Sequence, residues 1–444
     1  MRPRLNGLTG VATAEPHGLF PAISQSRRLR LAMIFILYVA QGVPVGLFYI
    51  AVPAWLAASG ASAAAVGTVL GATSLPWTLK FLNGFLMERY PYLPMGRRRA
   101  WLIGAQLTMA TFLFAMAALA PGPHDTALLA TLSFLVMTAT TFQDIAIDAM
   151  AVDLLQDDER ARANGLMFGG QAIGSGIAGT AAGFGIGRIG IGGVAALAGV
   201  ALLLLILLVV LCRERPGERL LPWTAGRASA ACEAAHLGAW GPMLRETWRA
   251  MTMRISLLFM LPMLCTGLYG GFYVGANPLL AVRAAGWSQE RIATFSSVGS
   301  FCAGLLVAVI ASPLVGRLGY RRAIQLVFAL VALAGLAMLA AQPLWAQGWP
   351  VAALILVSDP LNFTLAACLG AVAMRLCNPA VAATQFTLYM ATNNLGRSLG
   401  SWVLGSTDAI GGTTALVAGW VVIGLAGLLA AHIALEADPS QRPD

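Results

Sequence analysis

The chain has 444 residues, of which 58% are hydrophobic and only 11% are charged, and its mean hydropathy is +0.76. Soluble domains carry about 25% charged residues, so this composition excludes an ordinary water-soluble protein and predicts a membrane protein. The formal net charge is +9, but the arginines concentrate in alternate loops. That pattern is a membrane-orientation signal and argues against nucleic acid as a partner.

The first 30 residues contain arginines but no apolar core before Leu31. We therefore expect a basic cytoplasmic tail over residues 1–30 and not a signal peptide. Twelve apolar runs follow, each near the roughly 20 residues that cross a hydrocarbon layer of about 30 Å. The expected spans are 31–57, 63–87, 100–120, 127–153, 163–187, 192–212, 255–281, 289–315, 323–345, 350–376, 384–408 and 413–435.

The most polar interior stretch, residues 213–254, divides these runs into six and six. This pattern predicts an all-α membrane protein with twelve transmembrane helices in two six-helix pseudo-repeats. The expected parts are an N-terminal half (31–212), a cytoplasmic basic linker (213–254), a C-terminal half (255–437) and a cytoplasmic tail (438–444). The arginine bias and the even number of spans predict that both termini are cytoplasmic in a multi-pass protein of the inner membrane.

Two similarities between the halves indicate an internal duplication. FYIAVPAWLAASGAS (48–62) resembles FYVGANPLLAVRAAGWS (272–288), and both close the first span of their half. GRRR (96–99) is echoed by GYRR (319–322), and both open the third span. Shared placement favours the parallel repeats that occur in transporter folds.

Charges inside the spans are the most informative residues, because each costs at least about 2.5 kcal/mol at mid-membrane unless it is paired or hydrated. The chain's only lysine, Lys80, lies in the second expected span, and Asp144 and Asp148 lie one helical turn apart in the fourth. Counted inward from the same side, Lys80 is roughly 14 Å deep and Asp144 roughly 16 Å deep. We expect these three residues to couple transport to protons, since protonation of a carboxylate depends on nearby charge. A static ion pair between Lys80 and Asp144 is the alternative.

Further polar residues are candidates for a substrate cavity: Gln41, Gln143, Gln171, Tyr273, Asp359, Asn393 and Arg397. Gln41 precedes Gly42 and Pro44, where the first span should be irregular. Asp359 and Arg397 could form a second buried pair. An unpaired Arg397 would instead suit an anionic cargo, for which its planar guanidinium offers bidentate recognition.

Several other function classes are excluded by the same residues. Lys80 is flanked by Leu79 and Phe81, so the chain has no Gly-Lys-Ser/Thr phosphate loop and no ATP site of that type. The histidines and the six cysteines show no metal-ligand spacing. We therefore expect no enzyme activity, no cofactor and no metal.

The loop after the second expected span carries Gly84, Glu88 and Arg89, followed by Gly96, Arg97 and Arg98. This spacing resembles the loop signature of the major facilitator superfamily, with glutamate in place of the usual aspartate. Lys80-Phe81 before the loop, and Gln143-Asp144 followed by Asp148, are similar to the AmpG-type muropeptide permeases and the related acetyl-coenzyme A transporters. The resemblance covers roughly residues 41–170.

The resemblance implies alternating access by two rocking halves, with the loop around Glu88 and Arg89 helping to close the cytoplasmic side. The expected function is that of a monomeric secondary active transporter. It would take up an amphipathic or anionic, muropeptide-like solute with protons across the inner membrane. Two alternatives stay open: another small-molecule carrier of this superfamily, such as a siderophore importer or exporter, and a transport-dead membrane sensor or assembly factor.

Overall fold

The computed structural model describes residues 20–234, 245, 248–249, 251–376 and 382–436. Within these ranges the chain is helical and contains no β-strand. Eight helices are long and apolar enough to cross a membrane: Arg27–Ala58, Arg99–Leu119, Thr126–Ala151, Gly169–Val210, Arg254–Ala285, Arg317–Ala340, Trp349–Ala373 and Leu404–Ala434. The protein is therefore a multi-pass membrane protein with an all-α fold.

The helices follow the expected spans in chain order. The first part of the chain forms η1 (Ile23–Gln25), α1 (Arg27–Gly46), η2 (Leu47–Ala51), α2 (Val52–Ala58), α3 (Ala63–Arg89), η3 (Leu93–Met95), α4 (Arg99–Leu119), α5 (Thr126–Leu154), α6 (Asp157–Val210) and α7 (Ala230–Ala234). The second part forms α9 (Arg254–Ala285), α10 (Gln289–Ala340), η4 (Gln342–Gln347), α11 (Trp349–Leu376), α12 (Ala382–Trp402) and α13 (Leu404–Glu436).

Glycines interrupt the three longest helices where the sequence has gaps between apolar runs. Gly190 in α6 has φ 70° and Gly319 in α10 has φ 71°, values that glycine adopts without steric cost. Gly411 and Gly412 interrupt α13 in the same way. Each long helix thus changes direction at the place where two separate spans are expected.

The first span is irregular after Pro44, as its sequence indicates. Pro44 lies inside α1, and the five residues of η2 form a π-helix directly after α1. Short π segments inside helices are rare and occur frequently at functional sites. The irregular turn lies further along than Gln41 and includes Tyr49.

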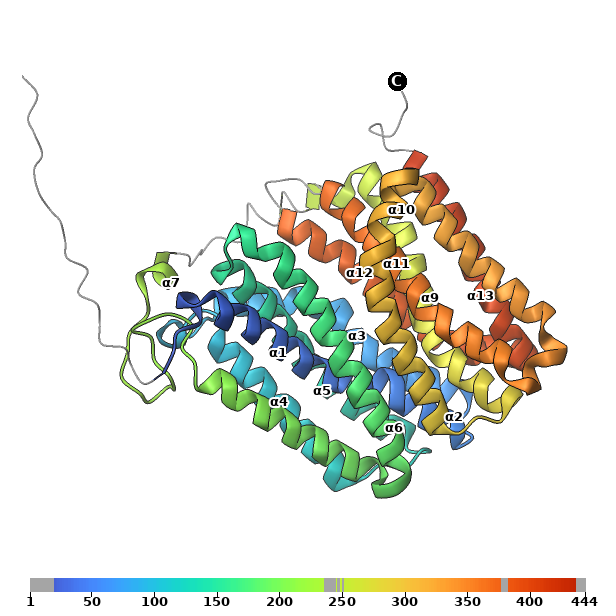
Figure 1. Ribbon diagram of the computed structural model, residues 1–444, viewed down its shortest axis with the longest axis horizontal. Helices are drawn as coiled ribbons and strands as arrows, with labels where there is room; N and C mark the ends of the chain where they lie inside the picture. Colours follow the sequence, from blue (N-terminus) through green and yellow to red (C-terminus); the bar gives the residue numbers. More distant parts are fainter. Residues whose placement is uncertain (1–19, 235–244, 246–247, 250, 377–381, 437–444) are drawn as a thin grey trace, which may run out of the picture.

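The helices form two groups that lie side by side, with α1, α4 and α5 in one and α9, α11 and α13 in the other (Figure 1). Helix α1 packs along α6 so closely that a Cβ atom on Gly42 would lie 2.7 Å from the backbone carbon of Gly174. The groups meet through α3 against α12 and through α6 against α10.

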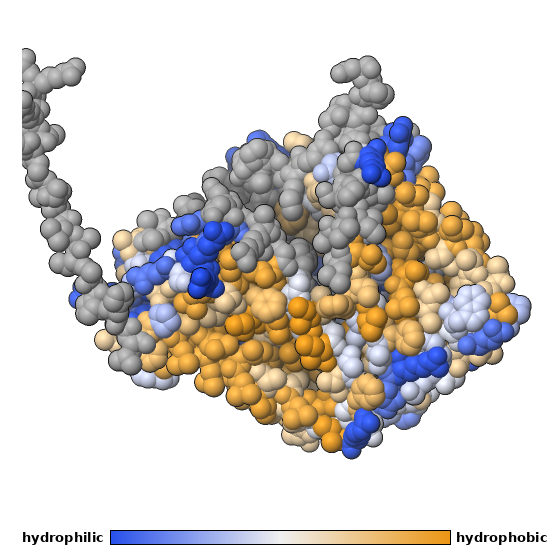
Figure 2. Space-filling model, viewed as in Figure 1, coloured by the Kyte–Doolittle hydropathy of each residue, from blue (hydrophilic) through white to orange (hydrophobic). Residues whose placement is uncertain are grey.

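Apolar side chains cover much of the outer surface (Figure 2). Leu197 and Leu204 on α6 are both 62% exposed, and Val422 on α13 is 65% exposed. A soluble protein rarely exposes a continuous apolar surface of this kind. The surface is suited to lipid.

Candidate functional site

Lys80 and Asp144, which the sequence places at matching depths, contact each other. The Lys80 Nζ atom on α3 lies 3.0 Å from Asp144 Oδ2 on α5. Gln41 of α1 donates from Nε2 to the other oxygen, Asp144 Oδ1, at 2.6 Å. The Lys80 ammonium also lies 5.6 Å from the ring centre of Trp77, one turn earlier on α3. Three helices thus meet on one carboxylate.

Asp148 lies one turn further along α5 and has a different partner. The Tyr38 hydroxyl of α1 donates to Asp148 Oδ1 at 2.5 Å. No basic nitrogen of the described chain lies within 4.0 Å of Asp148. Asp144 is therefore compensated by a cation, whereas Asp148 receives a neutral hydroxyl.

A second polar cluster lies in the other helix group. Asp359 of α11 accepts hydrogen bonds from the hydroxyls of Tyr273 on α9 and Ser300 on α10. Arg397 of α12 forms no ion pair with Asp359, nor with any other described carboxylate within 4.0 Å. Of the two arrangements that the sequence leaves open, the structure has the unpaired arginine.

Arg397 lies against the opposite helix group. Its guanidinium carbon is 5.7 Å from the ring centre of Tyr49 in η2, and the Tyr49 hydroxyl lies 3.1 Å from Ser74 Oγ. A Cβ atom on Gly270 would meet Asn362 Oδ1 at 3.2 Å and Arg397 Nη2 at 3.4 Å, so the glycine leaves room for both. This is a cation–π contact between the two groups, with a partly exposed guanidinium.

The other cavity candidates have mixed surroundings. Gln143 is buried and donates to the Leu37 carbonyl at 3.1 Å, so it holds α5 to α1. Asn393 donates to the Met263 carbonyl at 3.1 Å and holds α12 to α9. Gln171 is partly buried on α6. In the described part of the structure, these three side chains form no hydrogen bond with the charged residues of the two clusters.

The loop residues Gly96, Arg97 and Arg98 hold the start of α4. The two arginines lie 3.3 and 3.2 Å from the Asp153 carboxylate at the end of α5. Their backbone N–H groups donate to Glu214, and a Cβ atom on Gly96, which has φ 96°, would meet the carboxyl carbon of Glu214 at 2.7 Å.

The structure describes fewer contacts for the other three residues of the expected gating loop, Gly84, Glu88 and Arg89. Nothing lies within 4 Å of a Cβ atom placed on Gly84. The side chains of Glu88 and Arg89 lie outside the described part of the chain. Their expected gating contact therefore stays a prediction.

Two buried arginines differ from what the charge pattern indicates. Arg99 is fully buried and donates to the carbonyls of Val209, Val210, Arg219 and Leu220. Arg30, expected in the basic tail, is buried inside α1 and donates to both carboxylate oxygens of Glu159 on α6, at 2.6 and 2.9 Å.

Two carboxylates outside the apolar spans have shifted pKa values of opposite direction. The hydrogen bonds from Arg30 hold the pKa of Glu159 below its usual range. Burial raises the pKa of Glu214, although backbone N–H donors of α4 oppose that rise. The hydrogen bonds from Arg30 dominate at Glu159, whereas burial dominates at Glu214, although Arg215 lies 3.3 Å from that carboxylate.

Residues 34–401 match the sequence profile described as Major Facilitator Superfamily, which covers most of the chain. The chain belongs to this superfamily. Membership places the protein among secondary transporters and not among enzymes. The helical architecture in Figure 1 is consistent with this family.

Relatives within the superfamily confirm the resemblance to AmpG-type permeases. The Anhydromuropeptide permease of Escherichia coli K12 is 31% identical over 131 residues, which are 30% of this chain and 26% of that protein. A transporter of Rickettsia conorii named AmpG 4 is 31% identical over 156 residues, 34% of this chain and 37% of that protein. The chain thus matches only about a quarter of the length of the Escherichia coli permease.

Solved structures confirm the superfamily fold over nearly the whole chain. The nucleoside transporter NupG (D323A mutant) has a TM-score of 0.66 at 14% identity and covers 91% of this chain and 99% of that chain. A POT family transporter in complex with 5-aminolevulinic acid has a TM-score of 0.64 at 12% identity. The match covers 93% of this chain and 96% of that chain. At such low identity these likenesses establish the fold alone.

Proposed function

We propose that this transporter couples proton entry to uptake of an anionic, muropeptide-like solute across the inner membrane. The observation that carries the proposal is the pair of unequal carboxylates on α5: among the described residues, Lys80 and Gln41 hold Asp144, and Tyr38 holds Asp148. A site with one fixed charge and one exchangeable proton is what a proton-driven carrier requires.

We further propose the topology that the sequence indicates: twelve spans in two halves (31–212 and 255–437), a cytoplasmic linker (213–254) and cytoplasmic termini. The glycine breaks in α6, α10 and α13 support twelve spans. Gly96 and Gly319 open the two echoed arginine motifs and have similar backbone angles. Gly96 has φ 96° and ψ 166°, and Gly319 has φ 71° and ψ 162°. That similarity supports the proposed duplication.

In the proposed mechanism, the proton travels on Asp148. Two carboxylates one turn apart repel each other when both are ionised, and Lys80 forms its ion pair with Asp144 at 3.0 Å. When Asp148 takes up a proton, its hydrogen bond with Tyr38 loses a charged acceptor and becomes weaker. Since Tyr38 and Gln41 are both on α1, proton binding changes how firmly α1 is held to α5. We propose that this change releases the halves to move.

The cargo side of the proposal depends on Arg397. Arg397 is a partly exposed residue with no carboxylate partner among the described residues, so its guanidinium suits a carboxylate or phosphate group on the solute. The named relative that transports anhydromuropeptide supports a muropeptide-like cargo. A carboxylate siderophore would present the same chemistry, so a competition uptake screen with both solute classes distinguishes the two cargoes.

The test of coupling uses Lys80→Ala and Asp144→Asn in purified protein reconstituted into liposomes with an imposed pH gradient. We expect both variants to stay folded and to lose proton-driven uptake of muropeptide. Asp408→Asn is a matched control, because Asp408 pairs with the partly exposed Arg283 at 2.6 Å, away from this cluster.

A double variant, Lys80→Gln with Asp144→Asn, separates coupling from a structural strut. Removing one partner of a buried pair costs about 3–5 kcal/mol, whereas removing both charges is often nearly neutral. If the single variants unfold and the double variant shows the wild-type pH dependence of uptake, the pair is only a structural strut and the coupling proposal fails. If the folded wild type binds solute but moves none under any gradient, the carrier proposal itself fails.

A further inference from the structure

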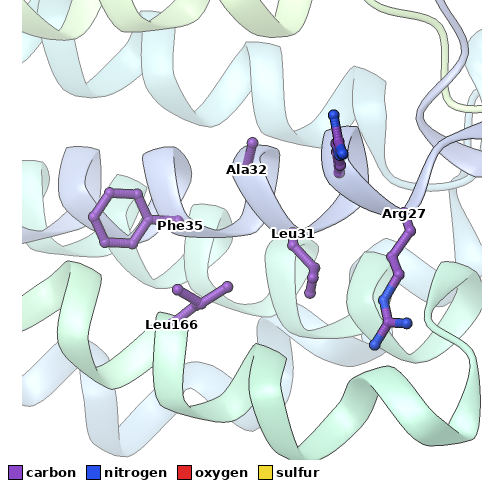
Figure 3. Close-up of a pocket in the computed structure, with 6 residues that line it drawn as sticks. Arg27, Leu31, Ala32, Phe35 and Leu166 are labelled. Atoms are coloured by element: carbon purple, nitrogen blue, oxygen red, sulfur yellow. The ribbon is translucent and has the colours of Figure 1, made fainter.

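A groove of about 500 Å³ lies between α1 and α6, apart from the charged cluster. Its lining residues are Arg27, Arg28, Leu31, Ala32, Phe35 and Leu166. Figure 3 shows Arg27, Leu31 and Phe35 in order along α1, with Leu166 of α6 facing them. The volume falls within the roughly 300–1,000 Å³ of small-molecule sites.

The groove has a basic mouth and an apolar interior. Arg27 and Arg28 begin α1 and are both exposed. One and two turns further along, Leu31 and Phe35 present only hydrocarbon, as does Leu166 across the groove. The ligand that fits such a site has an anionic end and a long apolar part.

Three arginines, Arg27, Arg28 and Arg30, lie at the mouth of the groove in the described part of the chain. Glu159 is the described carboxylate beside it, and both of its oxygens are engaged by Arg30 at 2.6 and 2.9 Å. Arg27 reaches the same carboxylate at 3.7 Å. Arg28 forms no ion pair within the described part of the chain. Arg27 and Arg30 thus both engage Glu159, and Arg28 adds an exposed guanidinium beside them.

Rigid contacts set the spacing between the two helices at this end. The buried Arg30–Glu159 pair joins α1 to α6, and Arg30 also donates to the Ser24 carbonyl at 2.6 Å. Gln156 and Glu159 form a capping box that fixes the first turn of α6. The groove is therefore formed before any ligand enters.

We propose that this groove binds an anionic phospholipid, with its phosphate between Arg27 and Arg28 and one acyl chain along Leu31, Phe35 and Leu166. The arginines stand where an apolar span begins, which is the level of lipid headgroups, and basic pockets between helices on the cytoplasmic side are suited to such headgroups. A free phosphate ion would use the arginines and leave the apolar interior to water.

The experiment measures lipid binding to the full purified chain by native mass spectrometry in detergent. The probes are dioleoyl-phosphatidylglycerol, dioleoyl-phosphatidylcholine and inorganic phosphate. We expect saturable binding of one phosphatidylglycerol, weaker binding of phosphatidylcholine, and little competition from inorganic phosphate. Arg27→Gln with Arg28→Gln should weaken phosphatidylglycerol binding by roughly thirtyfold, as expected for two arginines near an anionic headgroup.

Two further variants test each half of the site. Ala32→Trp, at an exposed lining position, should block the acyl chain while both arginines remain. Arg317→Gln, at an exposed arginine on α10 outside the groove, should leave binding unchanged. The proposal is overturned if phosphatidylcholine binds as tightly as phosphatidylglycerol, if inorganic phosphate displaces the lipid, or if Arg317→Gln has the same effect as the double variant. Monodisperse size-exclusion profiles verify that each variant is folded.

Discussion

Asp144 and Asp148 show how partners give two identical side chains different roles. The ammonium of Lys80 and the amide of Gln41 occupy both oxygens of Asp144, so that buried carboxylate has one charged and one neutral partner. Asp148 has one hydroxyl donor from Tyr38. Because a hydroxyl can both donate and accept, Tyr38 can serve Asp148 in either protonation state.

Arg397 gives a prediction about cargo at the residue scale. In uptake assays, Arg397→Gln should raise the KM for an anionic muropeptide about 10- to 100-fold, because hydrogen bonds to charged groups contribute about 1.5–3 kcal/mol. Arg397→Lys should recover only part of this loss, since lysine lacks the planar fork and the stacking on Tyr49. Arg283→Gln is the matched control. An unchanged KM in Arg397→Gln would place the solute elsewhere.

The sequence predicts how deep a residue lies along its helix, but not which neighbouring side chain it faces. Depth along a helix follows from counting, so the matching depths of Lys80 and Asp144 were predictable, whereas their contact depends on which helices are neighbours. Which hydroxyl faces a carboxylate depends on helix rotation, which one sequence does not specify; Ser300 beside Asp359 carried no signal. Arg30 and Arg99 counted as loop charges, but carboxylate and carbonyl acceptors at the ends of helices allow them to be buried.

At the scale of elements, α1 and α6 are joined at one end by charge and along their length by close backbone contact. The Arg30–Glu159 pair forms the first contact, and Gly42 against Gly174 forms the second. Hydropathy alone predicted both helices but not their pairing. It also predicted a gap near residues 188–191, where Gly190 breaks the helical backbone of α6 with a positive φ of 70°.

The Arg30–Glu159 pair predicts a pH dependence of stability. The pKa of Glu159 is lower in the folded protein than its ordinary value of about 4.3. The pair therefore stabilises the fold fully above that value, and its contribution is lost as the pH falls through the lower, folded pKa. The melting temperature of Glu159→Gln in detergent should lie below that of the wild type at pH 7. The difference should shrink as the pH falls below about 4.

A difference in melting temperature between Glu159→Gln and the wild type that stays constant across that pH range would contradict the stabilising role of the Arg30–Glu159 pair. Glu233→Gln is a suitable control because Glu233 is exposed on the short α7. Its melting temperature should follow that of the wild type at each pH.

For the whole molecule, two close contacts join the two groups at the end opposite to the arginine-rich loops. Gln289 at the start of α10 donates to the Gly183 carbonyl of α6 at 3.2 Å. A Cβ atom on Gly405 would lie 2.7 Å from the Cβ atom of Ala64 at the start of α3. If the termini are cytoplasmic, as proposed, these contacts hold the two groups together on the external side.

This closure can be tested by a reversible cross-link between Ala64→Cys and Gly405→Cys, in a chain whose native cysteines are replaced by alanine. Disulfides need Cβ atoms about 3.5–4.5 Å apart, and the close approach at this position lets the two cysteines reach that range with a small shift. Oxidation should abolish uptake and a reductant should restore it, because alternating access requires this end to open in each cycle. Each single cysteine variant should transport equally well under both conditions. If the cross-linked protein transports at the wild-type rate, these contacts do not separate during transport and the two halves do not move apart at this end.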